Sequence, residues 1–171
     1  QMNIAIARTV GQVLSIPEET MDRVVAGFNP LPVRLEKVGE YRDIAFYDDS
    51  LATIPEATLA SINALEHVDT IILGGLDRGI SYDEFARELD KTLIKNFIIF
   101  PETGEKIVTK VGERNIKRVR TMEDAVRAAY QFGPGICLLS NASPSFNIFK
   151  DYKDKSAQYR HHNRNGAINV V

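Results

Sequence analysis

Residues 70–79 read TIILGGLDRG, an unbroken apolar run followed by a glycine-rich segment. An apolar run this short predicts a β-strand that is covered on both faces, which is typical of the parallel sheet of an α/β protein. The glycines Gly74, Gly75 and Gly79 favour a tight turn and a close approach of the backbone to a neighbouring segment. The stretch therefore predicts a buried strand with a compact loop at its carboxyl end.

Strand and helix patterns alternate on both sides of this stretch. Periodicity and turn residues predict strands at 33–38, 44–47, 70–73, 97–100, 117–120 and 136–139, with a turn at 39–43, and helices at 55–65, 82–93, 104–111, 122–130 and 146–159. Such alternation predicts an α/β fold with a Rossmann-like, doubly wound and mostly parallel sheet.

Two further helices are predicted nearer the N-terminus, at 3–14 and 17–28. The segment 29–32, Asn-Pro-Leu-Pro, follows them, and two prolines this close forbid a helix and favour an extended linker. A pair of helices alone leaves its apolar stripes without a partner. We therefore predict a domain boundary here, with residues 1–30 as the end of another domain and residues 31–171 as the α/β domain.

The charge of the chain gives no general attraction to nucleic acid or to anionic membranes, because the formal net charge is -2. Basic residues do gather between 106 and 120, but Glu105 and Glu113 interrupt them and no aromatic residue lies among them. We interpret this segment as a solvated face. We expect neither a nucleic acid nor a membrane as a partner.

The single cysteine, Cys137, lies in the apolar run 136–139. We interpret it as a small buried hydrophobic residue with a raised thiol pKa, and not as a nucleophile. No apolar stretch approaches the roughly 20 residues that a membrane-spanning helix needs. The first residues lack the basic-then-apolar order of a signal peptide, so the expected location is the cytoplasm.

The loop that includes Thr53 is the first of three predicted loops that follow a strand and precede a helix. Loops of this kind lie at the sheet edge where ligands of α/β proteins bind. Thr53, Pro55 and Glu56 have the pattern of a helix-capping box. The Thr53 hydroxyl either caps the helix or helps to bind an anion at its N-terminus, and the two interpretations are compatible.

The other two loops carry Arg78 and Ser145. Arg78 either grips a carboxylate with paired N–H donors or forms a surface ion pair with Asp77 or Asp83. Ser145 has the position of the N-cap of the last predicted helix. The three loops together are able to converge on one acidic ligand.

The remaining polar motifs predict no metal site and no catalytic residue. His67 stands at a predicted helix end, and His161 and His162 are adjacent, so they do not share a helix face as two ligands of one metal would. The chain also lacks the G-x-x-x-x-G-K-[ST] loop that cradles nucleotide phosphates.

Several segments occur here in a characteristic order. They are Asn3, 31–34 (LPVR), 49–53 (DSLAT), 74–79 with Tyr82 and Asp83, 103–106 (TGEK), and 139–152 (LSNASPSFNIFKDY). On these segments the chain resembles the C-terminal part of the Mur ligases, from residue 3 to about residue 159. The likeness implies that residues 1–30 end the central ATP-binding domain and that 31–171 form the amino-acid-binding domain.

The resemblance, strongest to members that add D-glutamate, also implies an activity. It implies ATP-dependent joining of D-glutamate to UDP-N-acetylmuramoyl-L-alanine through an acyl-phosphate intermediate, a step of peptidoglycan precursor synthesis. It implies ATP and Mg2+ as cofactors, bound mainly by the rest of the central domain, so that this chain alone would be inactive. It further implies a monomer.

Residue roles also follow from the resemblance. Asn3, Arg34 and Asp49 would bind the nucleotide. Thr53, Arg78, Ser145 and Tyr152 would surround the amino-acid substrate.

The chain departs from the pattern of the family at several positions. Leu51 and Ile54 replace a lysine and an asparagine, Asn141 replaces a proline, and Lys155-Ser156 replace Arg-Gly. Two alternatives therefore stay open. One is a divergent relative that adds another acidic amino acid, and the other is a non-catalytic Rossmann-like module that binds an anion.

Overall fold

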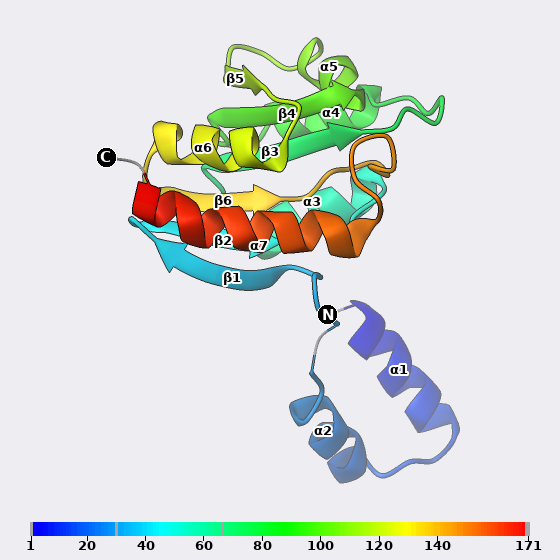
Figure 1. Ribbon diagram of the computed structural model, residues 1–171. Coiled ribbons are helices and arrows are strands. Elements are labelled where there is room, and N and C mark those ends of the chain that lie inside the picture. Colours follow the sequence, from blue (N-terminus) through cyan, green and yellow to red (C-terminus); the bar gives the residue numbers. More distant parts are fainter. Residues whose placement is uncertain (1, 30, 66, 170–171) are drawn as a thin grey trace. The chain divides into compact units, whose positions relative to one another are not determined.

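The computed structural model describes residues 2–29, 31–65 and 67–169. The chain divides into two compact units, Gln1–Leu31 and Pro32–Val171. The first unit holds the two helices predicted near the N-terminus, α1 (Met2–Val13) and α2 (Glu18–Ala26) (Figure 1). Pro30, in the predicted linker, lies outside the described residues.

The second unit contains one sheet with the strand order β1-β2-β6-β3-β4-β5 among its described residues. The strands are β1 (Glu36–Tyr41), β2 (Ile44–Asp48), β3 (Thr70–Gly75), β4 (Asn96–Glu102), β5 (Asn115–Arg118) and β6 (Gly135–Leu139). Only the β1–β2 pair of this sheet is antiparallel, and the other described neighbours are parallel. The predicted mostly parallel α/β fold is confirmed.

Helices cover both faces of this sheet, so each face has its own apolar core (Figure 1). The helices α6 (Met122–Phe132) and α7 (Tyr152–Asn169) cover one face. The helices α3 (Pro55–Ala64), α4 (Asp83–Asp90) and α5 (Thr103–Val108) cover the other. Because both faces are covered, β3 is buried along its whole length, as the apolar run predicts.

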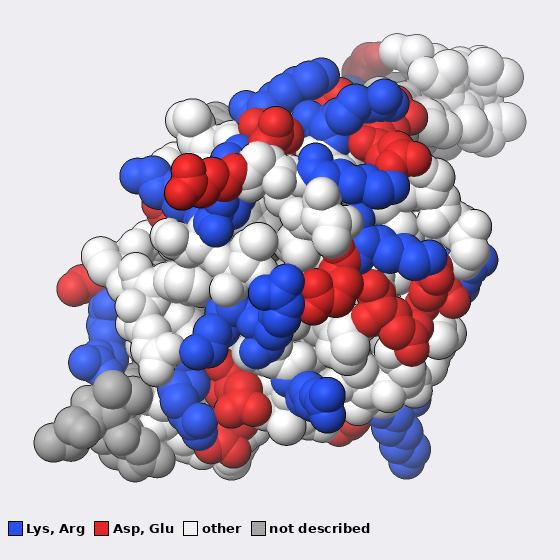
Figure 2. Space-filling model, turned by 90° about the horizontal axis from the view of Figure 1, so that it is seen from above, with Lys and Arg blue, Asp and Glu red and all other residues white. Residues whose placement is uncertain are grey.

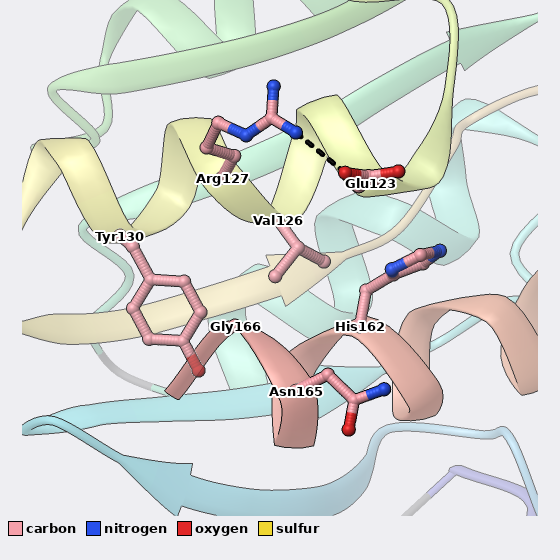
Figure 3. Close-up of a pocket in the computed structure, with 7 residues that line it drawn as sticks. All are labelled: Glu123, Val126, Arg127, Tyr130, His162, Asn165 and Gly166. Atoms are coloured by element: carbon pink, nitrogen blue, oxygen red, sulfur yellow. Dashed lines mark hydrogen bonds and ion pairs between the residues drawn. The ribbon is translucent and has the colours of Figure 1, made fainter. Parts of the chain in front are cut away.

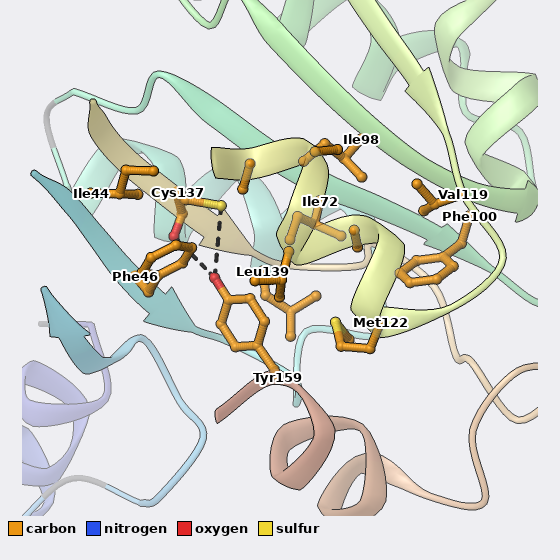
Figure 4. Packing of buried hydrophobic residues seen from close by; sticks show 14 of the residues in the cluster. Ile44, Phe46, Ile72, Ile98, Phe100, Val119, Met122, Cys137, Leu139 and Tyr159 are labelled. Atoms are coloured by element: carbon orange, nitrogen blue, oxygen red, sulfur yellow. Dashed lines mark hydrogen bonds between the residues drawn. The ribbon is translucent and has the colours of Figure 1, made fainter. Parts of the chain in front are cut away.

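Cys137 is buried in the core under α6 and α7, as the sequence predicts (Figure 4). The Tyr159 hydroxyl on α7 donates a hydrogen bond to the Cys137 carbonyl oxygen at 3.3 Å. Burial raises the pKa of the Cys137 thiol to about 12. The thiol is therefore protonated at neutral pH and does not act as a nucleophile.

The first strand begins three residues later than expected, and the turn predicted at 39–43 is shorter, with only Arg42 and Asp43 between the two strands. Val33 and Leu35 have positive φ angles of 57° and 49°, and the Val33 N–H donates to Glu36 Oε2 at 2.9 Å. These residues therefore turn before the strand begins. Gly39 is part of β1, where the pairing register shifts between Lys37 and Gly39, so this glycine marks a strand irregularity.

The last helix begins at Tyr152, so the prediction of a start near residue 146 is wrong. The backbone N–H groups of Ile148 and Phe149 donate to the Ser145 carbonyl oxygen at 3.1 and 2.9 Å, which forms a turn. Phe149 is buried, and its ring packs edge-on against Phe100 at 5.4 Å between centroids. Tertiary packing thus holds this segment outside the helix.

The basic residues between 106 and 120 form a mixed, solvated face, which confirms the interpretation from sequence. Four of them pair with acidic residues of neighbouring segments: Lys106 with Asp77, Lys110 with Asp83, Arg114 with Asp90 and Arg118 with Glu105. Figure 2 shows basic and acidic side chains interleaved on the side of the molecule that it presents. None of the helices described is both long and apolar enough to cross a membrane.

Candidate functional site

The three loops singled out in the sequence follow neighbouring strands. In the sheet β6 lies between β2 and β3, and all three strands run parallel. Their carboxyl ends therefore meet at one edge, where the loops that carry Thr53, Ser145 and Arg78 lie side by side.

The loops after β3 and β6 are joined through their backbones. The Gly74 N–H donates to the Asn141 carbonyl oxygen at 3.0 Å, and the Leu76 N–H donates to the Pro144 carbonyl oxygen at 2.7 Å. A Cβ atom at Gly75 would lie 2.2 Å from that same Pro144 oxygen. The close backbone approach expected from these glycines is confirmed.

Asp49, at the start of the loop after β2, is fully buried. Its Oδ2 accepts hydrogen bonds from the Ser61 and Ser140 hydroxyls at 2.6 and 2.9 Å. Its Oδ1 has no hydrogen-bond partner in the described part of the chain. Burial raises the pKa of Asp49 above its ordinary value, while the two hydroxyls, Arg34 and the Leu35 N–H oppose that shift.

Asp48 is a second buried carboxylate beside Asp49, and its hydrogen bond with Ser156 connects α7 to the sheet. Its Oδ1 accepts from the Ser50 hydroxyl at 2.6 Å, and its Oδ2 accepts from the Ser156 hydroxyl at 2.5 Å. The Arg160 guanidinium lies 3.6 Å from that Oδ2. The carboxyl end of β2 thus holds two carboxylates inside a polar network.

A buried cation, Lys155, completes this network. Its Nζ donates to Asn141 Oδ1 at 2.8 Å. Burial lowers the pKa of Lys155 to about 8, while Asp48 and Asp49 favour the charged form. In the sequence, Asn141 and Lys155 are visible only as departures from a family pattern, and their contact is not predictable from it. The signal was weak, because a lysine on a polar helix is usually exposed.

Thr53 is exposed, and the prediction that it caps α3 is wrong. The N-cap is Ile54, in an extended conformation with φ −137° and ψ 152°. Pro55 occupies the first turn, as expected, and this proline places the helix boundary one residue after Thr53. The Thr53 hydroxyl is therefore not engaged in capping.

Arg78 is exposed, and the alternative of an ion pair with Asp77 or Asp83 is wrong. Asp77 pairs with Lys106 and Asp83 pairs with Lys110. No salt bridge joins Arg78 to any residue within the described ranges. Its guanidinium is available to a ligand.

Ser145 is 7% exposed and is not the N-cap of the last helix, contrary to prediction. The Asp151 side chain accepts the Asp154 N–H at 2.8 Å, as an N-cap does, because α7 begins only at Tyr152. Tyr152 is 39% exposed at this first position of α7. Ser145 and Tyr152 thus bracket the segment that leads from β6 into α7.

The nucleotide-binding candidates divide between the two units. Arg34 is exposed near the buried Asp49 in the second unit, where its charge acts on the Asp49 carboxyl. Asn3 is an exposed residue of α1 in the first unit. The structure brings Arg34 and Asp49 together and leaves the place of Asn3 relative to them undefined.

A separate hollow lies between α6 and α7 (Figure 3). It is lined by Glu123, Val126, Arg127, Tyr130, His162, Asn165 and Gly166. Within it Arg127 Nη2 lies 2.6 Å from Glu123 Oε1. The described residues contain no cluster of His, Cys, Asp or Glu side chains able to hold a metal ion.

Residues 33–143 match the family model described as the Mur ligase, glutamate ligase domain. This chain therefore belongs to the Mur ligase family. A relative from Caldanaerobacter subterraneus subsp. tengcongensis, named UDP-N-acetylmuramoylalanine--D-glutamate ligase, is 31% identical over 166 residues, which are 92% of this chain and 36% of the relative.

A relative from a Micromonospora species, named UDP-N-acetylmuramoyl-L-alanine--L-glutamate ligase, is 31% identical over 159 residues, or 90% of this chain and 35% of the relative. A crystal structure of MurF from Acinetobacter baumannii shares the fold with a TM-score of 0.71 and 13% identity, over 93% of this chain and 36% of that one. The chain spans about a third of the length of the curated relatives that it matches.

Proposed function

We propose that this chain is the C-terminal portion of an ATP-dependent ligase that adds D-glutamate to UDP-N-acetylmuramoyl-L-alanine through an acyl phosphate. The observation that carries the proposal is the exposed Arg78, which forms no ion pair with a described residue and lies on the loop next to that of Ser145, with the loop of Thr53 on the other side of Ser145. The name of the Caldanaerobacter relative supports the choice of D-glutamate.

Four residues would hold the amino acid. D-Glutamate offers two carboxylates, and the Arg78 guanidinium would bind one of them with two parallel N–H donors. The hydroxyls of Thr53 and Ser145 would donate to carboxylate oxygens, and the ring of Tyr152 would border the same space. Fixed in this way, the amine of the substrate would be oriented for attack on an activated carboxyl group.

The nucleotide would lie beside Arg34 and Asp49. The exposed Arg34 guanidinium would donate to a phosphate oxygen, and the charge of the buried Asp49 carboxylate would help to hold that guanidinium beside the nucleotide. ATP supplies the phosphoryl group that activates the acceptor carboxylate. We propose that Mg2+ accompanies ATP and is bound mainly by the rest of the central domain.

We propose that residues 1–30 end the central ATP-binding domain and that Asn3 contacts the adenine. The rest of that domain would hold most of the nucleotide, so the present chain alone would not turn over. The proposed ligase would act in the cytoplasm as a monomer.

A second candidate is a ligase that adds another acidic amino acid, L-glutamate in particular. It is favoured by the Micromonospora relative, whose identity to this chain equals that of the D-glutamate relative, at 31%. The changes at Leu51 and Ile54, next to Thr53, point in the same direction.

Phosphate release by the intact ligase that contains this chain would test both candidates. The acceptor, ATP and Mg2+ would be supplied with D-glutamate, L-glutamate, D-aspartate or L-aspartate in turn. We expect the highest kcat/KM with D-glutamate, and a preference for L-glutamate would select the second candidate. Release with none of the four would contradict a ligase and favour an anion-binding module.

The variant R78M would test the proposed role of Arg78 in the same assay. Loss of a charge-assisted contact of about 1.5–3 kcal/mol predicts a rise in KM for the amino acid of roughly 10- to 150-fold. R87M is the matched control, because Arg87 is an exposed arginine of α4 outside the proposed site. Equal effects of R78M and R87M would contradict the assignment.

A further inference from the structure

Lys155 is a lysine of α7 that is 1% exposed. Burial of an ammonium group is costly unless the group is paired and hydrogen-bonded. Here the ammonium donates to Asn141 Oδ1 at 2.8 Å and lies in the field of Asp48 and Asp49. Its position places a positive charge behind the three loops of the proposed site.

Asn141 connects this charge to the loop after β3. Its side-chain Nδ2 donates to the Gly74 backbone carbonyl oxygen at 2.6 Å. Its backbone carbonyl oxygen accepts the Gly74 N–H at 3.0 Å. An ammonium group has donors only, so it forces Asn141 Oδ1 to face Lys155. The Nδ2 group must then face Gly74, which makes the orientation of the amide a consequence of Lys155.

Gly74 is the last residue but one of β3, directly before the loop that carries Arg78. The contacts from Lys155 through Asn141 therefore fix the end of this strand, and the bond from the Leu76 N–H to the Pro144 carbonyl oxygen fixes the start of the loop. Lys155 itself does not reach the exposed face where Arg78 lies. Its effect on a ligand would be transmitted through the backbone of residues 74–78.

We propose that Lys155 is a positioning residue, which orients Asn141, holds Gly74 and so places Arg78 beside the loop of Ser145. The inference rests on the proposed function, because the ligand of Arg78 belongs to that proposal. Lys155 would thus lie outside the binding surface and determine how firmly the loop of Arg78 is held there.

Amide hydrogen exchange measured by NMR on the 171-residue chain tests the proposal. K155M keeps the length of the side chain and removes the ammonium, K155R keeps a cationic donor, and K153M changes an exposed lysine of the same helix. We expect K155M to lower the protection of the Gly74 amide at least tenfold relative to the Asn96 amide, which bonds the Asp69 carbonyl elsewhere in the sheet. K155R should restore protection to within threefold of wild type, and K153M should leave it unchanged.

A double-mutant cycle with N141A separates positioning from general loosening of the fold. If Lys155 acts through Asn141, adding K155M to N141A changes Gly74 protection less than twofold. The side-chain amide signals of Asn141 should also shift in K155M and return in K155R. If K155M does not fold, K155Q replaces it in the same comparison.

Three results would each overturn the proposal. One is unchanged protection of the Gly74 amide in K155M, and another is an equal loss of protection at the Asn96 amide. The third is a double variant in which the loss caused by K155M multiplies the loss caused by N141A. The exchange readout needs no ligand. Failure of the intact ligase with every amino acid would therefore count against the proposed function alone, and the exchange result would still decide the role of Lys155.

Discussion

Among single residues, Gly75 best shows how the backbone shapes the site. A Cβ atom there would meet the Pro144 carbonyl oxygen at 2.2 Å, and a backbone atom cannot move away cheaply. We predict that G75A lowers the free energy of unfolding by about 2–3 kcal/mol, measured by urea titration.

G79A is the control for this prediction. Gly79 has a φ of 75° but open space around its Cβ position, so alanine there would cost only about 1–2 kcal/mol of backbone strain. A smaller effect at Gly75 than at Gly79 would contradict the close approach of the two loops.

The buried Asp49 should make the stability of the fold depend on pH. Its folded-state pKa is raised by burial, so the folded protein holds this proton more tightly than the unfolded chain does. Ionisation of Asp49 therefore costs stability, and the cost grows as pH rises from the ordinary carboxyl pKa through the raised folded value. We predict that the stability of D49N relative to wild type increases over this range, measured by urea unfolding at several pH values.

E84Q is the matched control, since Glu84 is an exposed carboxylate of α4. Its stability relative to wild type should stay nearly constant with pH. A D49N difference that is flat, or that falls as pH rises, would show that Asp49 is not held in a costly environment.

Residues with distinctive local chemistry are predictable from the sequence, whereas residues defined by distant contacts are not. The close backbone approach at Gly74 and Gly75 is predictable, because it depends on a property of glycine itself. The prediction that Thr53 and Ser145 cap helices is wrong, since Pro55 and the packing of Phe149 set the helix boundaries. The contact of Lys155 with Asn141 spans 14 residues, and no local pattern reveals it.

At the level of elements, the order of strands and helices was predictable, while several boundaries were not. Periodicity located β3 and α6 because each has a clear apolar pattern. The buried face of α7 is instead largely polar, with Lys155, Ser156, Tyr159 and Asn163 at helical spacing. Such a face carries little hydrophobic signal, which explains why the prediction placed this helix too early.

The polar face of α7 makes contacts that should contribute to the stability of the fold. Ser156 donates to the buried Asp48 Oδ2 at 2.5 Å, and Arg160 Nη2 lies 2.7 Å from Glu36 Oε2 on β1. We predict that S156A lowers the free energy of unfolding by roughly 1.5–3 kcal/mol, because a buried carboxylate loses a donor.

Chemical denaturation of S156A beside K153A would measure this effect. Lys153 is an exposed residue of the same helix, and its truncation should change stability by less than about 0.5 kcal/mol. If the two variants were equally stable, the Ser156–Asp48 contact would not fasten α7.

For the molecule as a whole, the decisive feature is that β6 lies between β2 and β3. The last strand of the chain thereby brings its loop between two loops that precede it by about 60 to 90 residues. Sequence order alone does not give this placement, although the parallel pattern predicted one shared edge. The proposed amino-acid site depends on it.

The first unit buries few of its apolar side chains. Most of its larger apolar side chains are exposed, among them Ile6, Val10, Val13, Val24 and Phe28, while Met21 is buried. This agrees with our proposal that residues 1–30 end a larger domain, and with a chain that spans about a third of its curated relatives.

Mapping of D-glutamate on the 15N-labelled chain tests the central claim most directly. We predict chemical-shift changes in the loops at residues 49–54, 74–79 and 141–152, and their loss in R78M but not in R87M. Shift changes confined to other surfaces, such as the hollow between α6 and α7, or none at millimolar D-glutamate, would contradict the account.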